Sequence, residues 1–123
     1  MKKSELEDRL VRFSVDVINL TENLKECYAS QHLAKQLIRS GTSSALNYGE
    51  AQGAPTKKDF IHKISIVLRE LRESQNNLRI ILYSGLAQND DQIRSILDEC
   101  SQLTAIFTKT FQTARNNEMK EKE

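Results

Sequence analysis

The sequence has few residues that interrupt helices and lacks the features of several other protein classes. Its 123 residues include one proline, four glycines and no tryptophan. Scarce helix breakers favour long, uninterrupted helices. No apolar run approaches the ~20 residues of a membrane span, and no apolar stretch follows Lys2 and Lys3 as it would in a secretory signal. We therefore expect long helices and no membrane partner.

Cysteine is also scarce, and its placement bears on the cellular compartment. Cys27 and Cys100 are far apart, and neither belongs to a Cys-x-x-Cys pair. Isolated thiols in a chain without a signal are typical of a reducing cytoplasm. We predict a cytoplasmic location.

Length and charge fit one soluble domain with a mildly basic middle. Apolar residues make up 38% and charged residues 28%, which is ordinary for a globular protein. Residues 27–88 carry eight basic and four acidic residues, although the whole chain has a net charge of only +1. This bias is compatible with a polyanion partner but is weaker than in a dedicated nucleic-acid module.

Apolar residues recur at helical spacing in four segments. We predict helices at about residues 4–26, 29–52, 57–84 and 90–116, then a mobile tail at 117–123. Short connections between amphipathic helices predict an all-α fold, an antiparallel up-down-up-down four-helix bundle. The expected core stripes are Leu6, Leu10, Phe13, Val17, Leu20 and Leu24; Phe60, Ile64, Val67, Leu71, Ser74, Leu78 and Ile81; and Ile93, Leu97, Cys100, Thr104, Phe107, Phe111 and Ala114.

Capping residues mark several of these boundaries. Ser4 is a plausible N-cap of the first helix, and Thr56 with Asp59 three residues later forms a capping-box pattern. Asn89 can cap the fourth helix, and Gly85 is a natural stop for the third.

The second helix allows two interpretations. Residues 39–45 are rich in serine, threonine and glycine, which favours a loop and a break at Gly41. Alternatively the helix continues to Gln52, and its small residues let a neighbouring backbone approach. We favour continuity, because Leu37, Gly41, Ala45 and Tyr48 keep the spacing of one helical face.

Three stretches of this sequence resemble a known family. Residues 36–51, 57–63 and 68–74 are similar to the four-helix-bundle proteins called 23S rRNA intervening sequence proteins. A mild departure lies at residues 44–46, where Ser-Ala-Leu replaces the more usual apolar-Gly-Ala or apolar-Pro-Ala. The positions that match the family pattern are Arg39, Ser40, Ser43, Asn47, Glu50, Lys58, Asp59, Phe60, Glu70 and Ser74.

The resemblance implies an assembly but no established activity. Members of the family form pentamers of bundles around a central axis, and some are encoded inside insertions in 23S rRNA genes. A related family, the accessory proteins of diversity-generating retroelements, uses a basic pentameric ring to bind nucleic acid and a reverse transcriptase. By resemblance we therefore expect a bacterial homo-oligomer, with a pentamer as the expected stoichiometry.

Polar residues of the matching stretches are candidates for a network at the oligomer interface. Such residues beside small ones often specify an interface, but they can equally be ordinary surface charges. The candidates are Arg39, Ser43, Asn47, Glu50, Asp59, Glu70 and Glu73.

Basic residues of the third helix are candidates for phosphate contact. A solvated helix face is the alternative, and repetition in a ring would strengthen weak contacts by avidity. The sequence shows no aromatic interleaving of the kind that stacks bases, so base-specific reading is not expected. The candidates are Lys57, Lys58, Lys63, Arg69, Arg72 and Arg79.

No motif predicts catalysis, a metal, a cofactor or a small-molecule substrate. His32 and His62 lack ligands at metal-binding spacing, and the sequence has neither a Gly-x-Ser-x-Gly elbow nor a phosphate-binding glycine loop. We predict a non-enzymatic oligomeric scaffold that binds RNA or a ribonucleoprotein. The alternative is a protein-binding adaptor ring that docks an enzyme.

Overall fold

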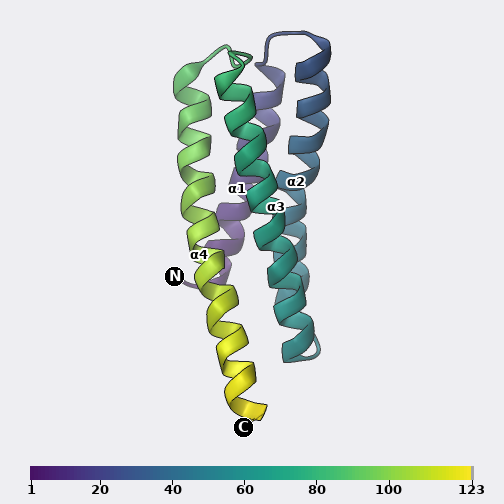
Figure 1. Cartoon of the computed structure of the whole chain (residues 1–123), viewed down its shortest axis with the longest axis vertical. Coiled ribbons are helices and arrows are strands. Elements are labelled where there is room, and N and C mark those ends of the chain that lie inside the picture. Colours follow the sequence, from purple (N-terminus) through teal and green to yellow (C-terminus); the bar gives the residue numbers. More distant parts are fainter. Residues whose placement is uncertain (123) are drawn as a thin grey trace.

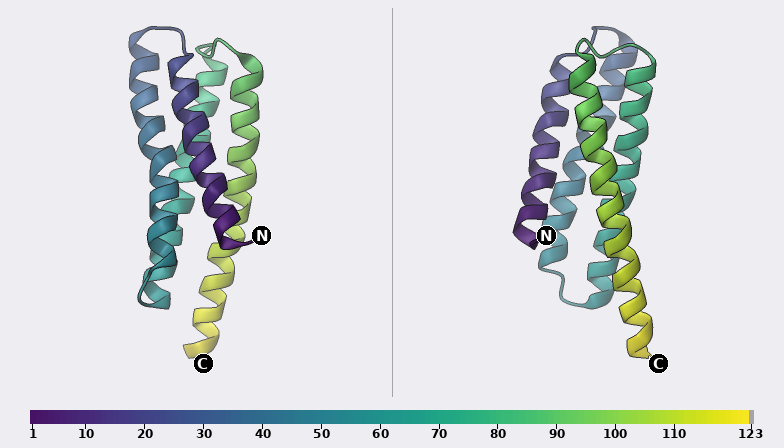
Figure 2. Two further views of the ribbon diagram at one scale, coloured as in Figure 1. Left: turned by 180° about the vertical axis from the view of Figure 1, so that it is seen from behind. Right: turned by 90° about the vertical axis from the view of Figure 1, so that its left-hand side faces the viewer.

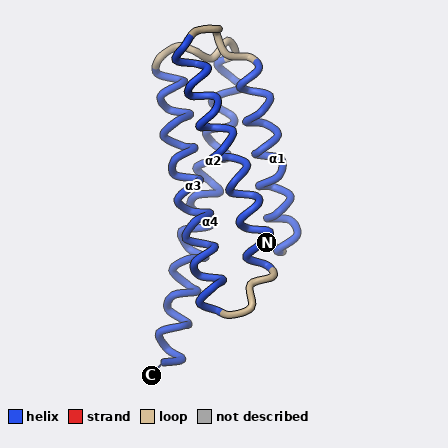
Figure 3. The backbone as a smooth tube through the Cα atoms, turned by 90° about the vertical axis from the view of Figure 1, so that its right-hand side faces the viewer, coloured by secondary structure: helices blue, strands red, loops and turns tan. Residues whose placement is uncertain are grey.

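The computed structural model describes residues 1–122, which form four helices (Figure 1). The elements are α1 (Lys3–Glu22), α2 (Tyr28–Gln52), α3 (Lys57–Tyr83) and α4 (Asp90–Lys122). Loops lie alternately at the two ends, so successive helices run in opposite directions (Figure 3). Among the described residues, the β-structure is limited to one isolated bridge between two loops. The predicted all-α four-helix fold is confirmed.

Each helix packs against two neighbours. α2 packs against α1 and α3, and α4 packs against α3 and α1. Within residues 1–122, α1 and α3 make no backbone contact of their own and therefore lie diagonally across the bundle. Their outer faces point away from each other, as the views in Figure 2 show.

The predicted core stripes are confirmed on α1 and nearly so on α3. All six positions from Leu6 to Leu24 are buried, and on α3 only Phe60 stays partly exposed. The α4 stripe is rotated from the prediction, because Ile96 and Leu103 are buried whereas Leu97 and three later positions are only partly so. Spacings of three and four fit either choice, and the contacts with α1 and α3 decide between them.

The second helix is continuous, as predicted, and its small residues serve close packing (Figure 3). Gly41 is buried against α1: the Ser14 hydroxyl donates to the Gly41 carbonyl at 3.2 Å. A Cβ at Gly41 would lie 3.4 Å from both methyl groups of Val17. On the other side, the buried Ser40 and Ser74 hydroxyls are 2.7 Å apart, joining α2 to α3.

The predicted first helix starts within one residue of the observed one, but its N-cap and its C-terminal end are wrong. α1 begins at Lys3 with Lys2 as its N-cap, so Ser4 does not cap it. It ends at Glu22 instead of continuing to about residue 26. The reason is that residues 23–25 pair with the α3–α4 loop: Lys25 N–H donates to the Leu86 carbonyl at 2.8 Å. Leu24 lies in the loop after α1, and its side chain is still buried in the core.

The ends of α3 follow the predicted capping chemistry. The Thr56 side chain accepts from the Asp59 N–H at 3.1 Å. At the other end Gly85 has a φ of 70°, a left-handed conformation that glycine adopts without strain. Leu86 N–H donates to Ile81 and Gly85 N–H to Leu82, which is the Schellman arrangement.

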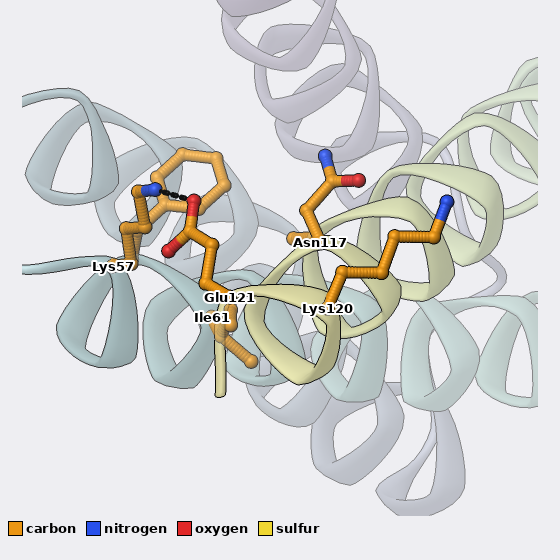
Figure 4. Close-up of a pocket in the computed structure, with 7 residues that line it drawn as sticks. Lys57, Ile61, Asn117, Lys120 and Glu121 are labelled. Carbon is orange, nitrogen blue, oxygen red and sulfur yellow. Dashed lines mark hydrogen bonds and ion pairs between the residues drawn. The ribbon is translucent and has the colours of Figure 1, made fainter. Parts of the chain in front are cut away.

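The fourth helix is longer than predicted. Asn89 caps it by accepting from the Gln92 N–H at 3.0 Å. α4 continues to Lys122, so residues 117–122 are helical rather than a separate tail; the last residue of that predicted tail, position 123, lies outside the described residues. The final turns extend beyond the N-terminal end of α1 (Figure 2). Lys57 of α3 pairs there with Glu121 of α4 (Figure 4).

Candidate functional site

Three of the seven predicted polar residues meet in one cluster between α2 and α3. Arg39 lies 3.1 Å from a Glu70 oxygen and 2.5 Å from a Glu73 oxygen. Hydrogen bonding to Glu73 and the charge of Glu70 raise the pKa of Arg39. The Glu70 side chain is only 4% exposed, whereas that of Arg39 is 59% exposed. Arg39 therefore compensates a buried carboxylate from the edge of the bundle.

The other four predicted polar residues lie elsewhere. Asn47 donates to Ser43 on its own helix, and Glu50 pairs with Lys63 at 2.8 Å. Asp59 is part of the α3 cap. Because each of these groups has its partner within one chain, none of them requires a second protomer for pairing.

Ion pairs separate the six phosphate-contact candidates into two groups. Lys57 pairs with Glu121 across the pocket in Figure 4, and Lys63 pairs with Glu50. Arg69 has a longer contact, 3.6 Å, with Glu70. Within residues 1–122, no carboxylate lies in ion-pair distance of the three others, which are Lys58, Arg72 and Arg79.

Arginines of two helices share the outer side of the α3–α4 pair, which we call the arginine face. A groove there of about 360 Å³ is lined by Arg69, Arg72 and Phe111, among others. Gln75 of α3 donates to Ser101 of α4 at 2.9 Å along the same seam. The arginine face comprises Arg69, Arg72 and Arg79 of α3 with Arg94 and Arg115 of α4.

Two aromatic rings accompany these arginines. The Arg79 guanidinium lies over the Tyr83 ring at 5.8 Å from its centre, and Arg115 lies over Phe111 at 5.6 Å. Arg94 pairs with Asp90 at 2.6 Å. The hydrogen bond to Asp90 is the main cause of a raised pKa of Arg94. Tyr83 is near enough to add to this increase. The site therefore combines cationic groups with aromatic surface.

Carboxylates are few on the arginine face, and those present have partners. Glu73 lines the groove but bonds Arg39, and Asp90 bonds Arg94. Arg94, Phe111 and Arg115 were not predicted from the sequence, because nothing in it indicates which side of α4 packs beside α3, and Tyr83 was predicted only as a packing residue. The helical spacing of Arg72, Asn76, Arg79 and Tyr83 was the one available signal.

A second exposed surface is apolar and lies on α1. Three apolar residues follow one another there at spacings of four and three: Val11, Val15 and Ile18. Their exposed fractions are 48%, 50% and 39%. Ile38 of α2, 36% exposed, lies on the neighbouring helix. We call Val11, Val15 and Ile18 the α1 stripe. Apolar residues grouped on an exposed face are typical of a protein contact surface.

The two cysteines lie in opposite environments. Cys27 is exposed and caps α2, and its pKa is lowered by the hydrogen bond from the Ser30 backbone and by the Ser30 side chain. Cys100 is buried, and desolvation raises its pKa to about 12.

Neither a metal-binding group nor a membrane-spanning helix occurs within residues 1–122. No group of three or more His, Cys, Asp and Glu side chains is placed to hold a metal ion. None of the described helices combines the length and apolar character that a bilayer crossing requires.

Comparison with known proteins identifies a family and similar solved structures. The family model described as 23S rRNA-intervening sequence protein matches residues 2–109. Among solved structures, the chain is similar to a protein of unknown function from the S23 ribosomal protein family of Bacteroides thetaiotaomicron, with 28% identity and a TM-score of 0.75. The match covers 86% of this chain and 97% of that one. No curated protein matches the chain.

Proposed function

Because the chain belongs to the 23S rRNA-intervening sequence protein family, we propose that it is a non-catalytic, oligomeric scaffold that binds RNA or a ribonucleoprotein. The observation that carries the proposal is the arginine face. Arg72 and Arg79 are exposed there without a carboxylate partner within residues 1–122. Unpaired cations gathered on one side favour a polyanion.

The α1 stripe supports the oligomeric part of the proposal. Burying Val11, Val15 and Ile18 against another copy would remove apolar surface from water. A homopentamer, as the resemblance implies, would repeat the arginine face five times and strengthen weak RNA contacts by avidity. Since α1 and α3 are diagonal neighbours, the stripe can be covered while the arginines stay accessible. We place this assembly in the bacterial cytoplasm, where Cys27 and Cys100 would stay reduced.

An adaptor ring that docks a partner enzyme is the second candidate. It is favoured by the same α1 stripe, because an apolar face fits a foreign protein as well as another copy. In that case the arginine face would have no nucleic-acid role. The two candidates therefore differ in whether the purified chain binds RNA.

Titration with labelled RNA at low and raised salt tests the proposal. We expect binding that weakens steeply with salt, because phosphate contacts release counterions. Arg72→Gln should lower the affinity and reduce the salt slope by about 1. Lys57→Gln is the matched control on the same helix, since Lys57 already pairs with Glu121, and it should change little. Absence of binding at low salt would reject the RNA-binding scaffold and favour the adaptor.

A further inference from the structure

We infer that the arginine face holds a single-stranded segment of RNA, with Tyr83 stacking on an unpaired base. This inference rests on the proposed RNA-binding function and specifies the form of the nucleic acid. The occupant follows from two properties that occur together on this surface: cationic side chains for phosphates and exposed aromatic surface for bases.

The arginines form a continuous track along α3. Arg69, Arg72, Asn76, Arg79 and Tyr83 follow at spacings of three and four residues, which places them on one side of the helix. From Arg69 to Tyr83 the helix rises roughly 21 Å at 1.5 Å per residue. This length suits several nucleotides of an extended strand.

Tyr83 has the properties of a stacking platform. Tyr83 is the last residue of α3 and is 75% exposed. Such exposure is unusual for a large aromatic residue. Arg79 lies over the ring, and Arg79 also donates to Asn76 at 3.4 Å. The guanidinium that contacts the ring is thus anchored on the track itself, where it can meet a phosphate next to a stacked base.

The groove between α3 and α4 offers a second aromatic surface. Phe111 lines it together with Arg69 and Arg72, and Arg115 lies over the Phe111 ring. Phe111 is half-buried, so less of its ring is available than of Tyr83. Each arginine–aromatic pair lies within one helix, but the two pairs come from different helices, so the sequence alone does not show that they share one face.

Stacking on protein side chains selects unpaired bases. In a duplex the base faces are covered by their neighbours, whereas bases of a single strand can stack on tyrosine. A phosphate-only surface would accept both forms, because charge alone does not distinguish them. The aromatic rings are therefore what predicts a preference for single strands, without a preference for any one base.

Tyr28 provides a matched control for Tyr83. It is also exposed, at 85%, but lies at the start of α2, stacked on His32 at 6.5 Å between ring centres. It belongs to neither the arginine face nor the groove. Replacing either tyrosine removes a similarly exposed ring, but only Tyr83 lies on the arginine face.

The test measures the binding of two probes by fluorescence anisotropy at low salt. One probe is a single-stranded oligouridine of about 12 nucleotides, and the other is an RNA duplex of similar length. For the single strand we expect Tyr83→Ala to lower affinity about fivefold or more, and Tyr83→Phe to restore it. Tyr28→Ala should leave it unchanged. Duplex binding should be weaker and insensitive to Tyr83→Ala.

The outcomes separate this inference from the function on which it rests. Equal affinity for both probes, with no effect of Tyr83→Ala, would overturn the inference and leave a phosphate-binding scaffold. Equal losses from Tyr83→Ala and Tyr28→Ala would also overturn it, since position would then not matter. Failure of the wild-type chain to bind either probe would reject the proposed function itself. Circular dichroism of each variant verifies that the bundle is intact.

Discussion

At the scale of single residues, Glu70 shows how an exposed partner can stabilise a buried charge. Its side chain is 4% exposed and depends on Arg39, which lies at the edge of the bundle. Glu73 makes the shorter contact with Arg39, but it is 47% exposed, so water can replace that interaction. The two glutamates therefore contribute differently to stability, although both bond the same guanidinium.

The first prediction concerns this difference. Arg39→Ala removes the nearer cation of the buried Glu70 and leaves only the longer 3.6 Å contact with Arg69, so we expect a loss of about 1–3 kcal/mol in the free energy of unfolding. Glu73→Ala should cost less than about 1 kcal/mol, because an exposed ion pair contributes little. Urea denaturation of both variants gives the two values. Equal costs would show that Glu70 does not depend on Arg39.

The second prediction concerns the two thiols. The lowered pKa of Cys27 gives it more thiolate than an ordinary cysteine near pH 8. Iodoacetamide should therefore modify the native chain at one site, and Cys27→Ala should abolish the reaction. Cys100 should react only after unfolding, since it is fully buried. Mass spectrometry counts the adducts, and two rapid adducts on the folded chain would contradict the assignment.

Cys100 also has a consequence for stability at high pH. Burial raises its pKa from 9.0 to about 12, so the folded state favours the neutral thiol. The stabilisation from this shift is complete below pH 9 and is lost as the pH rises toward 12. Cys100→Ala removes the titrating group and should flatten the fall in stability over this interval.

At the scale of the helix, periodicity predicted where each element lies more reliably than where it ends. The buried positions of α1 and α3 could be derived from the sequence because large apolar residues recur there at spacings of three and four along the whole helix. On α4, Leu97 and Leu103 fit alternative registers, and only the packed neighbours decide. The end of α1 depends on a loop pairing with residues more than 60 positions away, which local pattern does not encode.

The candidate site was predictable only where it lies on one helix. Arg72 and Arg79 could be identified on α3 from their spacing, but Arg115 and Phe111 reach the same face from α4. The ionic partners were unpredictable for the same reason: Lys57 meets Glu121 because α4 continues to Lys122.

The third prediction tests the register of α3. Leu71 is fully buried at the middle of its stripe, and Leu71→Ala should lower the free energy of unfolding by about 2–5 kcal/mol through lost burial and a cavity. Leu46→Ala makes the same change at a residue that is 69% exposed and should be nearly neutral. Thermal melting followed by circular dichroism compares them. A melting temperature of Leu71→Ala equal to that of the wild type would contradict the core assignment.

At the scale of the whole molecule, opposite sides of the bundle carry different surfaces. The α1 stripe is apolar, and the arginine face on the α3–α4 side is cationic. The diagonal relation of α1 and α3 keeps them apart. Assembly and RNA binding should therefore be separable by substitution.

The fourth prediction uses this separation. Val15→Lys places a charge in the middle of the α1 stripe and should reduce the mass of the assembly while leaving the helix content unchanged. Ile80→Lys is the matched control, because Ile80 is also 50% exposed but lies on α3. Light scattering at about tens of micromolar measures both. A wild-type chain that stays monomeric, or equal effects of the two variants, would reject the α1 stripe as the contact surface.

Two loops are hydrogen-bonded to each other at one end of the bundle, so we expect local unfolding to begin at the opposite end. The α1–α2 and α3–α4 loops are tied by Lys25 to Leu86 and by Gln88 to Asn23. At the other end α2 and α3 are joined by their own loop, whereas α1 is short and the end of α4 extends past it (Figure 2). Opening should begin where fewest contacts are lost. Amide hydrogen exchange is therefore expected to be fastest near Lys122 and to slow along α4 toward Asp90. Of the three loops, the hydrogen-bonded α1–α2 and α3–α4 loops should be protected longest.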